Sequence, residues 1–242
     1  MRKLKKRPSL PATSIKKLAE KTAQIVVDSD PKGKADSIYS SARSSNPQWF
    51  QEVVNALRTM SGAGERCMFC SGSESSDVEH FQPKSIFPHL AMTWDNFLWS
   101  CTICNRFKSN RFPPDTEPGP KLINPCEENV WDFFYVDEFG NLSPRWRTDL
   151  NDLDPRAVKT QEILKLDRQA LQESRQLRLR ELKQQVRDAV QLYQQGKLSK
   201  AQLKQRRKAW LKAPFQPDVA DYCFLGPGNR DEPYHTFLSI LT

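Results

Sequence analysis

The sequence lacks the features that mark membrane and exported proteins. Only 38% of its 242 residues are hydrophobic, and no run approaches the roughly 20 apolar residues that a membrane-spanning helix needs. The first seven residues are basic, but no apolar segment of the kind found in secretory signals comes after them. No internal repeat is present either. These absences favour a soluble, cytoplasmic chain that neither spans nor binds a membrane.

Histidine is scarce, and cysteine is distinguished by its spacing rather than its number. Of six cysteines, Cys126 and Cys223 stand apart from any motif and are interpreted as ordinary thiols. Two Cys-x-x-Cys pairs, thirty residues apart, contain the other four: Cys67, Cys70, Cys101 and Cys104. Paired spacing in a cytoplasmic chain favours metal ligation over disulfides, and over four unrelated buried thiols. Four thiolates fill a tetrahedral Zn²⁺ and leave no position for water, so the predicted zinc is structural.

The segment between the cysteine pairs carries residues that suit a second, catalytic metal. If it is extended, Asp77 and Glu79 project to one side and His80 to the other. A lone histidine is usually structural, but these neighbouring carboxylates favour a functional role. Asn105 follows the second cysteine pair, and its amide oxygen is suited to a hard cation such as Mg²⁺. Asn96 is expected to hydrogen-bond to backbone and to hold the loop that orients His80.

These residues occur in an order that resembles a known enzyme family. From Arg66 to Arg111 the chain contains Cys-x-x-Cys, then Asp-x-Glu-His-Phe-x-Pro-Lys, then Trp-x-Asn-x-x-Trp-x-Cys-x-x-Cys-Asn-x-x-Lys. This order is similar to the HNH endonucleases of the ββα-metal class, with His80, Asn96 and Asn105 at the signature positions. The family usually has Asp directly before the histidine, where this chain has Glu79.

The resemblance implies a mechanism for DNA cleavage. His80 would take a proton from the water that attacks the phosphorus. A divalent ion, Mg²⁺ or Mn²⁺, held by Glu79 and Asn105 with help from Asp77, would stabilise charge on the leaving 3′-oxygen. Which of the two carboxylates is the main ligand stays open. Asn96 would orient the loop that carries His80.

Positive charge is concentrated near the end of the chain. The formal net charge is +8, and residues 155–213 hold sixteen Lys and Arg against five Asp and Glu. This excess fits a solvated helical surface, a nucleic-acid contact or both. Within the motif, Lys108 or Arg106 is a candidate to hold a phosphate, and each is alternatively an ordinary solvated helix residue.

Local patterns predict the elements around the motif. Residues 14–27 and 48–60 are expected to be helical, and the stretch between them, rich in Ser, Asp, Pro and Gly, is expected to begin as a loop. A short helix should begin near Cys104 and end before Pro113. Residues 131–136 and 141–146 read as two strands joined by a turn. One long helix is expected from Asp154 to about Gln195, followed by a second, capped by Ser199 and reaching Lys212.

We therefore expect an α+β protein with a zinc-stapled ββα-metal HNH core and mainly helical additions at both ends. The expected regions are an N-terminal helical extension (1–60), the nuclease core (61–113), a connector with a β-hairpin (114–150) and a basic helical region (151–242). Residues 113–120 are a proline-rich connector.

Weaker similarity over most of the chain points to one HNH subfamily. The Glu-His-Phe-x-Pro-Lys form of the motif and the late segment 164–175 are similar to HNH effector nucleases of Septu-type anti-phage systems, which also occur with certain retrons. This resemblance implies an ABC-type ATPase partner. The alternatives are a stand-alone restriction-type HNH enzyme, which would need a sequence-reading domain that we do not find, and a zinc-stapled nucleic-acid or partner-binding module without catalysis.

Overall fold

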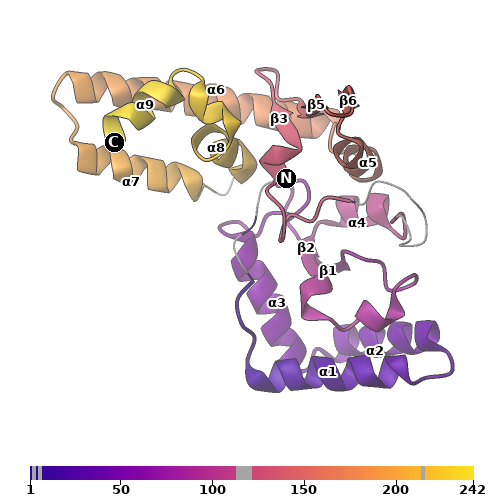
Figure 1. Cartoon of the computed structure of the whole chain (residues 1–242). Coiled ribbons are helices and arrows are strands. Elements are labelled where there is room, and N and C mark those ends of the chain that lie inside the picture. Colours follow the sequence, from indigo (N-terminus) through magenta and orange to yellow (C-terminus); the bar gives the residue numbers. More distant parts are fainter. Residues whose placement is uncertain (2–3, 5–6, 113–121, 214–215) are drawn as a thin grey trace.

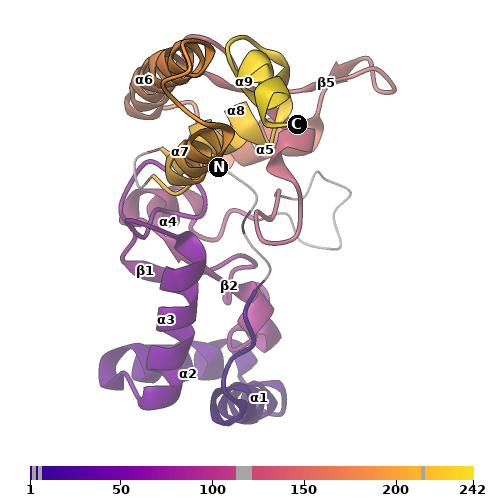
Figure 2. The ribbon, with the colours of Figure 1, turned by 90° about the vertical axis from the view of Figure 1, so that its left-hand side faces the viewer.

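The computed structural model describes residues 1, 4, 7–112, 122–213 and 216–242, so the connector predicted at 113–120 lies outside the described residues. The chain is α+β, as predicted, with many helices and small two-stranded sheets. Figures 1 and 2 separate a lobe around the helices of residues 12–61 from a lobe around the helices of residues 169–241. We call these the N-terminal and C-terminal lobes. In the part of the chain that the structure describes, no helix combines the length and apolarity needed to cross a membrane.

Three helices build the base of the N-terminal lobe. They are α1 (Ala12–Val26), α2 (Pro31–Ser45) and α3 (Gln48–Ser61). The first and third match the predicted helices. The predicted loop is confined to residues 27–30, and α2, which was not predicted, takes up most of the stretch between them. The Asp30 side chain accepts the N–H of Gly33 at 3.0 Å, and proline occupies the first helical position, so α2 has a well-capped start.

The motif folds as two strands followed by a helix. Strands β1 (Asp77–His80) and β2 (Phe97–Ser100) pair antiparallel, and α4 (Thr102–Lys108) comes directly after them. Two short 3-10 helices, η1 (Pro88–Leu90) and η2 (Trp94–Asn96), lie in the connection between the strands. The extended segment and the short helix predicted here are both confirmed, and α4 ends several residues before Pro113.

The hairpin predicted after the connector is present. After η3 (Val130–Asp132), β3 (Phe134–Val136) pairs antiparallel with β4 (Leu142–Pro144). Asp137 shapes the turn, because its Oδ1 accepts the N–H groups of Phe139 and Asn141, both at 2.9 Å. A small second pair, β5 (Trp146–Arg147) and β6 (Asp152–Leu153), was not predicted.

The C-terminal lobe is helical, but the single long helix predicted from Asp154 is wrong. The chain forms α5 (Pro155–Leu164) and α6 (Gln169–Gln194) instead. Lys165 takes the left-handed conformation with φ 49° and ends α5. Arg168 holds the break, because its Nη1 donates to the carbonyl oxygens of Leu164 at 2.8 Å and Lys165 at 3.0 Å.

The remaining helices complete this lobe. Ser199 caps α7 (Lys200–Leu211) in a capping box with Gln202, and Gly196 at φ 72° ends the preceding turn, both as predicted. The last elements are α8 (Pro217–Phe224), η4 (Pro227–Arg230) and α9 (Tyr234–Leu241). Buried apolar side chains from both lobes form one continuous hydrophobic cluster.

Candidate functional site

Four cysteine side chains from two distant segments meet in a buried cluster. Their Sγ atoms all lie within 4.8 Å of one another, and those of Cys70 and Cys101 are 3.9 Å apart. A tetrahedral Zn²⁺ with Zn–S bonds of about 2.3 Å needs sulfurs about 3.8 Å apart. The members are Cys67, Cys70, Cys101 and Cys104, which we call the cysteine cluster. Its size and donors fit a metal ion.

Local backbone structure brings each pair of sulfurs together. Cys101 is the N-cap residue of α4, and its Sγ accepts the N–H of Cys104 at 3.4 Å. The other pair lies in a tight turn, where the N–H of Cys67 donates to the oxygen of Ser73 and its carbonyl accepts the N–H of Ser71, both at 2.9 Å. A helix start and a turn therefore present two sulfurs each to the same point.

The cluster is surrounded by groups that bear on its charge. Hydrogen bonding by neighbouring thiols, with Cys104 first, lowers the pKa of Cys101 to about 7, while burial raises the pKa of Cys67. Arg168 adds a cation from the C-terminal lobe: its Nη2 lies 3.9 Å from Cys104 Sγ, and its guanidinium lies 5.4 Å from the ring centroid of Phe107. A guanidinium favours thiolates electrostatically. Nothing in the sequence indicated this contact.

His80 ends β1 and is buried, with 6% of its surface exposed. Its Nε2 lies 2.9 Å from the carbonyl oxygen of Ala91. Because a carbonyl only accepts, Nε2 carries the proton of the neutral ring and Nδ1 keeps its lone pair. Burial lowers the pKa of His80 from 6.5 to about 4, so the imidazole is neutral at neutral pH. A neutral ring with a fixed tautomer is suited to accept a proton at Nδ1.

Asn96 holds the segment after His80. Its Oδ1 accepts the N–H of Gln82 at 2.7 Å, and its Nδ2 donates to the carbonyl oxygens of Gln82 at 2.9 Å and Leu90 at 3.1 Å. The side chain is buried. These are backbone hydrogen bonds of the kind the sequence predicts for Asn96, and Leu90 stands next to the Ala91 carbonyl that fixes His80.

Glu79 and Lys108 form a buried ion pair. Lys108 Nζ lies 2.7 Å from Glu79 Oε1 and 2.6 Å from the backbone oxygen of His80, and its side chain has no exposed surface. Burial raises the pKa of Glu79 and lowers that of Lys108, and the attraction between the two charges opposes both shifts. Lys108 therefore points inward to β1. One oxygen of Glu79 is held by an ammonium, so a metal ion bound there would use the other oxygen or displace Lys108.

The other candidate residues lie on α4 and at the start of β1. Asn105 is half-buried on α4, one turn before Lys108. Arg106 is exposed on the same helix. Asp77 begins β1, and its Oδ1 accepts a hydrogen bond from Arg43 at 3.0 Å. The structure thus brings Glu79 and Lys108 into contact beside His80, and leaves Arg106 outside.

Helix α2 covers the outer side of His80, which sequence reasoning missed. The Tyr39 ring lies edge-on to the imidazole at a centroid distance of 4.5 Å, and its hydroxyl donates to the oxygen of Val78 at 2.6 Å. Asp36 forms an ion pair with Lys84, four residues after His80. Because this stretch was predicted to begin as a loop, no helical face was available to indicate these contacts.

Sequence comparison finds two relatives of known name. A Septu protein PtuB of Bacillus mycoides (strain KBAB4) is 31% identical over 109 residues, covering 33% of this chain and 36% of the relative. A Septu protein PtuB of Bacillus thuringiensis is 27% identical over 125 residues, covering 50% of this chain and 40% of the relative. No family model matches the chain, and no solved structure matches it.

Both matches are confined to part of each protein. In each case the matched part is less than half the length of the curated relative. The similarity to Septu proteins that the sequence predicts is supported, since both relatives carry the Septu name. By these matches, the chain is similar to Septu protein PtuB over a third to a half of its length.

Proposed function

We propose that the chain is a metal-dependent HNH endonuclease that hydrolyses DNA phosphodiester bonds. The observation that carries this proposal is His80, a buried neutral imidazole whose Nε2 is fixed by the Ala91 carbonyl, at the end of a strand that pairs with the strand leading into α4. The order β1, β2, α4, with a cysteine cluster that joins the turn before β1 to the start of α4, supports an HNH core.

In the proposed reaction, Nδ1 of His80 takes the proton of the attacking water. Asn96 keeps the segment after His80 in place through its three backbone hydrogen bonds. When bound by Glu79 and Asn105, with help from Asp77, Mg²⁺ or Mn²⁺ would supply charge stabilisation for the leaving 3′-oxygen. The carboxylate and amide oxygens of these residues suit a hard cation.

The cysteine cluster is proposed to hold structural Zn²⁺. Its four ligands leave no open position, so the chemistry is assigned to His80 and its neighbours. Arg106 is exposed and remains a candidate for a phosphate contact. Lys108 would reach a phosphate only by leaving Glu79 and the His80 carbonyl, and its proposed role here is to position β1.

We further propose that the nuclease is the effector of a Septu-type anti-phage system and works with an ABC-type ATPase. The similarity to two Septu PtuB proteins supports this setting. Copurification with the product of a neighbouring ATPase gene tests it. An ATPase that neither binds the chain nor changes its DNA cleavage would remove the partner from the proposal.

The nuclease is tested by cleavage of supercoiled plasmid with Mg²⁺ or Mn²⁺, with and without that ATPase. Loss of a general base lowers the rate by about 10²–10⁴, so His80→Ala should show almost no cutting. The matched control is His235→Ala, because His235 is an exposed histidine on α9. Equal cutting by the His80 variant would refute the assignment.

Two observations favour a second candidate, a nucleic-acid or partner-binding module without catalysis. Glu79 is already paired with Lys108, and His80 is covered by Tyr39. A chain that binds DNA, or a partner, but cuts nothing under any of these conditions would favour the module.

A further inference from the structure

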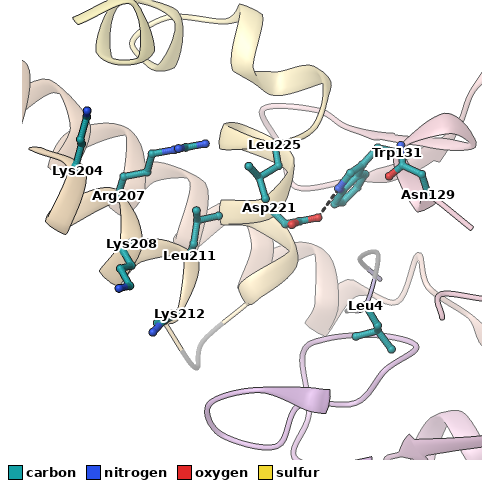
Figure 3. Close-up of a pocket in the computed structure, with 10 residues that line it drawn as sticks. All are labelled: Leu4, Asn129, Trp131, Lys204, Arg207, Lys208, Leu211, Lys212, Asp221 and Leu225. Atoms are coloured by element: carbon teal, nitrogen blue, oxygen red, sulfur yellow. Dashed lines mark hydrogen bonds between the residues drawn. The ribbon is translucent and has the colours of Figure 1, made fainter. Parts of the chain in front are cut away.

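Helix α7 forms one wall of a cleft in the C-terminal lobe. The cleft has a volume of about 710 Å³. Figure 3 shows cationic side chains on the α7 side, with Trp131 and Asn129 opposite and residues of the α8 region between them. The cations are Lys204, Arg207, Lys208 and Lys212. In Figure 1, α7 lies in a different lobe from β1, the strand that ends at His80.

The charge of this wall is of one sign. From Gly196 to Ala213 the sequence contains seven Lys and Arg and no Asp or Glu. Lys204, Lys208 and Lys212 are all exposed and recur at four-residue spacing, which places them along one face of the helix. The acid among the lining residues is Asp221, whose Oδ2 accepts a hydrogen bond from Trp131 Nε1 at 2.6 Å.

The cations of this wall are not neutralised within the described chain. Among the residues that the structure describes, none of the four lies in a salt bridge. Arg207 has its Nε buried without a hydrogen-bond partner. A bound ligand that accepts this hydrogen bond would satisfy the buried donor.

The cleft continues past Trp131. A second cavity of about 500 Å³ shares Asn129, Trp131 and Leu225 with the first. It adds the cations Arg145 and Arg230 and one acid, Asp132, and Arg145 Nε donates to the carbonyl oxygens of Trp131 at 2.8 Å and Phe134 at 3.0 Å. Together the two cavities form what we call the basic groove, with cations on both sides of Trp131. A row of cations this extended suits a polymer better than a mononucleotide. Lysine is depleted in protein–protein interfaces, whereas nucleic-acid interfaces are strongly positive.

We propose that the basic groove binds the phosphate backbone of DNA, at a place separate from the cysteine cluster and His80. The inference rests on the proposed function in that DNA is the substrate named there. The inference extends that function by assigning the place where the duplex is bound. Helix α7 would supply the phosphate contacts, and the N-terminal lobe would carry out the cleavage. Such contacts fix position without reading sequence.

The test is equilibrium binding of a fluorescent DNA duplex, measured by anisotropy without added divalent metal between about 50 and 200 mM salt. The variant is Lys204→Gln, Lys208→Gln and Lys212→Gln combined. Each lost phosphate contact lowers the slope of log K against log salt by about 0.9. The variant should therefore bind more weakly, with a slope lower by about 3. The control removes the same charge from exposed lysines of the N-terminal lobe: Lys16→Gln, Lys17→Gln and Lys32→Gln.

Each outcome decides the inference. An unchanged slope in the α7 variant, or an equal loss in the control, would overturn it. So would binding of labelled polyglutamate with no binding of DNA, which would assign the groove to an acidic protein. This binding test does not depend on DNA cleavage. If the chain binds DNA through the groove but cuts no plasmid, the inference stands and the proposed nuclease activity is refuted.

Discussion

The surroundings of His80 and the α7 wall of the basic groove carry charge in opposite ways. In the N-terminal lobe, charged side chains near His80 are paired: Lys108 with Glu79 out of solvent, and Arg43 with Asp77 at the edge. In the C-terminal lobe, the lysines of α7 that line the groove are exposed and in no salt bridge with a described residue. A buried pair fixes the position of strands and helices, whereas exposed unpaired cations attract a polyanion from solution. This difference supports positioning and chemistry in one lobe and capture in the other.

The largest expected effect is the loss of metal from the cysteine cluster, which should unfold the N-terminal lobe more than the C-terminal lobe. Cys67→Ser should lose zinc and unfold the region around β1, since structural zinc contributes roughly 10–16 kcal/mol of apparent binding free energy in zinc-finger peptides. Zinc content and hydrogen exchange measure both effects. Peptides from β1 and α4 should lose protection, while those from α7 should change less. His80→Ala and Cys126→Ser, outside the cluster, should keep full zinc. Zinc loss in His80→Ala equal to that in Cys67→Ser would contradict the separation of the two sites.

The buried ion pair should have the next largest effect. Lys108→Met leaves Glu79 as an uncompensated buried carboxylate, so we expect the free energy of unfolding to fall by about 3–5 kcal/mol. The matched variant is Arg106→Met, which removes an exposed cation from the same helix and should change stability by no more than about 0.5 kcal/mol. Urea unfolding measures both. Similar losses of unfolding free energy in the two variants would show that the Glu79–Lys108 pair contributes no more to stability than an exposed cation.

His80 makes stability depend on pH. The pKa of this histidine is about 4 in the folded chain, because of burial, against 6.5 when exposed. Its contribution is complete above pH 6.5 and is lost as pH falls from 6.5 towards 4, where the unfolded chain binds the proton more readily. The loss is about 3 kcal/mol. Urea unfolding across this range should show that fall, and His80→Asn should flatten it. An identical pH dependence in the variant would place the titration elsewhere.

The smallest effect belongs to the start of α7. Ser199→Ala removes the capping hydrogen bond to Gln202 and should lower the free energy of unfolding by about 1 kcal/mol, with little change from Ser199→Asp, which keeps an acceptor. Thermal unfolding measures the difference. At a temperature where α7 stays folded, Ser199→Ala should bind DNA as the native chain does. Weaker binding there would show that the lysines of the groove are not sufficient for DNA binding without the capping hydrogen bond.

Local signals account for what could be predicted from the sequence. The two Cys-x-x-Cys pairs, the β1 segment and the Ser199 cap each depend on residues close together in the chain, and each is found in the structure. Helix α2 escaped prediction because its buried face consists of the small Ala35 and Ala42 around Tyr39, which leaves no strong apolar stripe.

Contacts between distant segments account for the rest. The break between α5 and α6 lies within a stretch that reads as continuous helix, and it is held by the guanidinium of Arg168, which also approaches Cys104. The sequence allows Lys108 to be an ordinary solvated helix residue. It is buried instead, because its ammonium forms an ion pair with Glu79 on β1. The positions of Arg168 and Lys108 are set by partners distant in the sequence, which hydrophobic periodicity does not indicate.

The most direct test measures DNA binding and plasmid cleavage together for three proteins: the native chain, His80→Ala, and the α7 variant lacking Lys204, Lys208 and Lys212. We predict that His80→Ala binds DNA as tightly as the native chain but does not cut it, and that the α7 variant binds weakly and cuts slowly, with cutting restored at high DNA concentration. Native cutting by His80→Ala, or native DNA affinity in the α7 variant, would contradict the division of chemistry and capture between the two lobes.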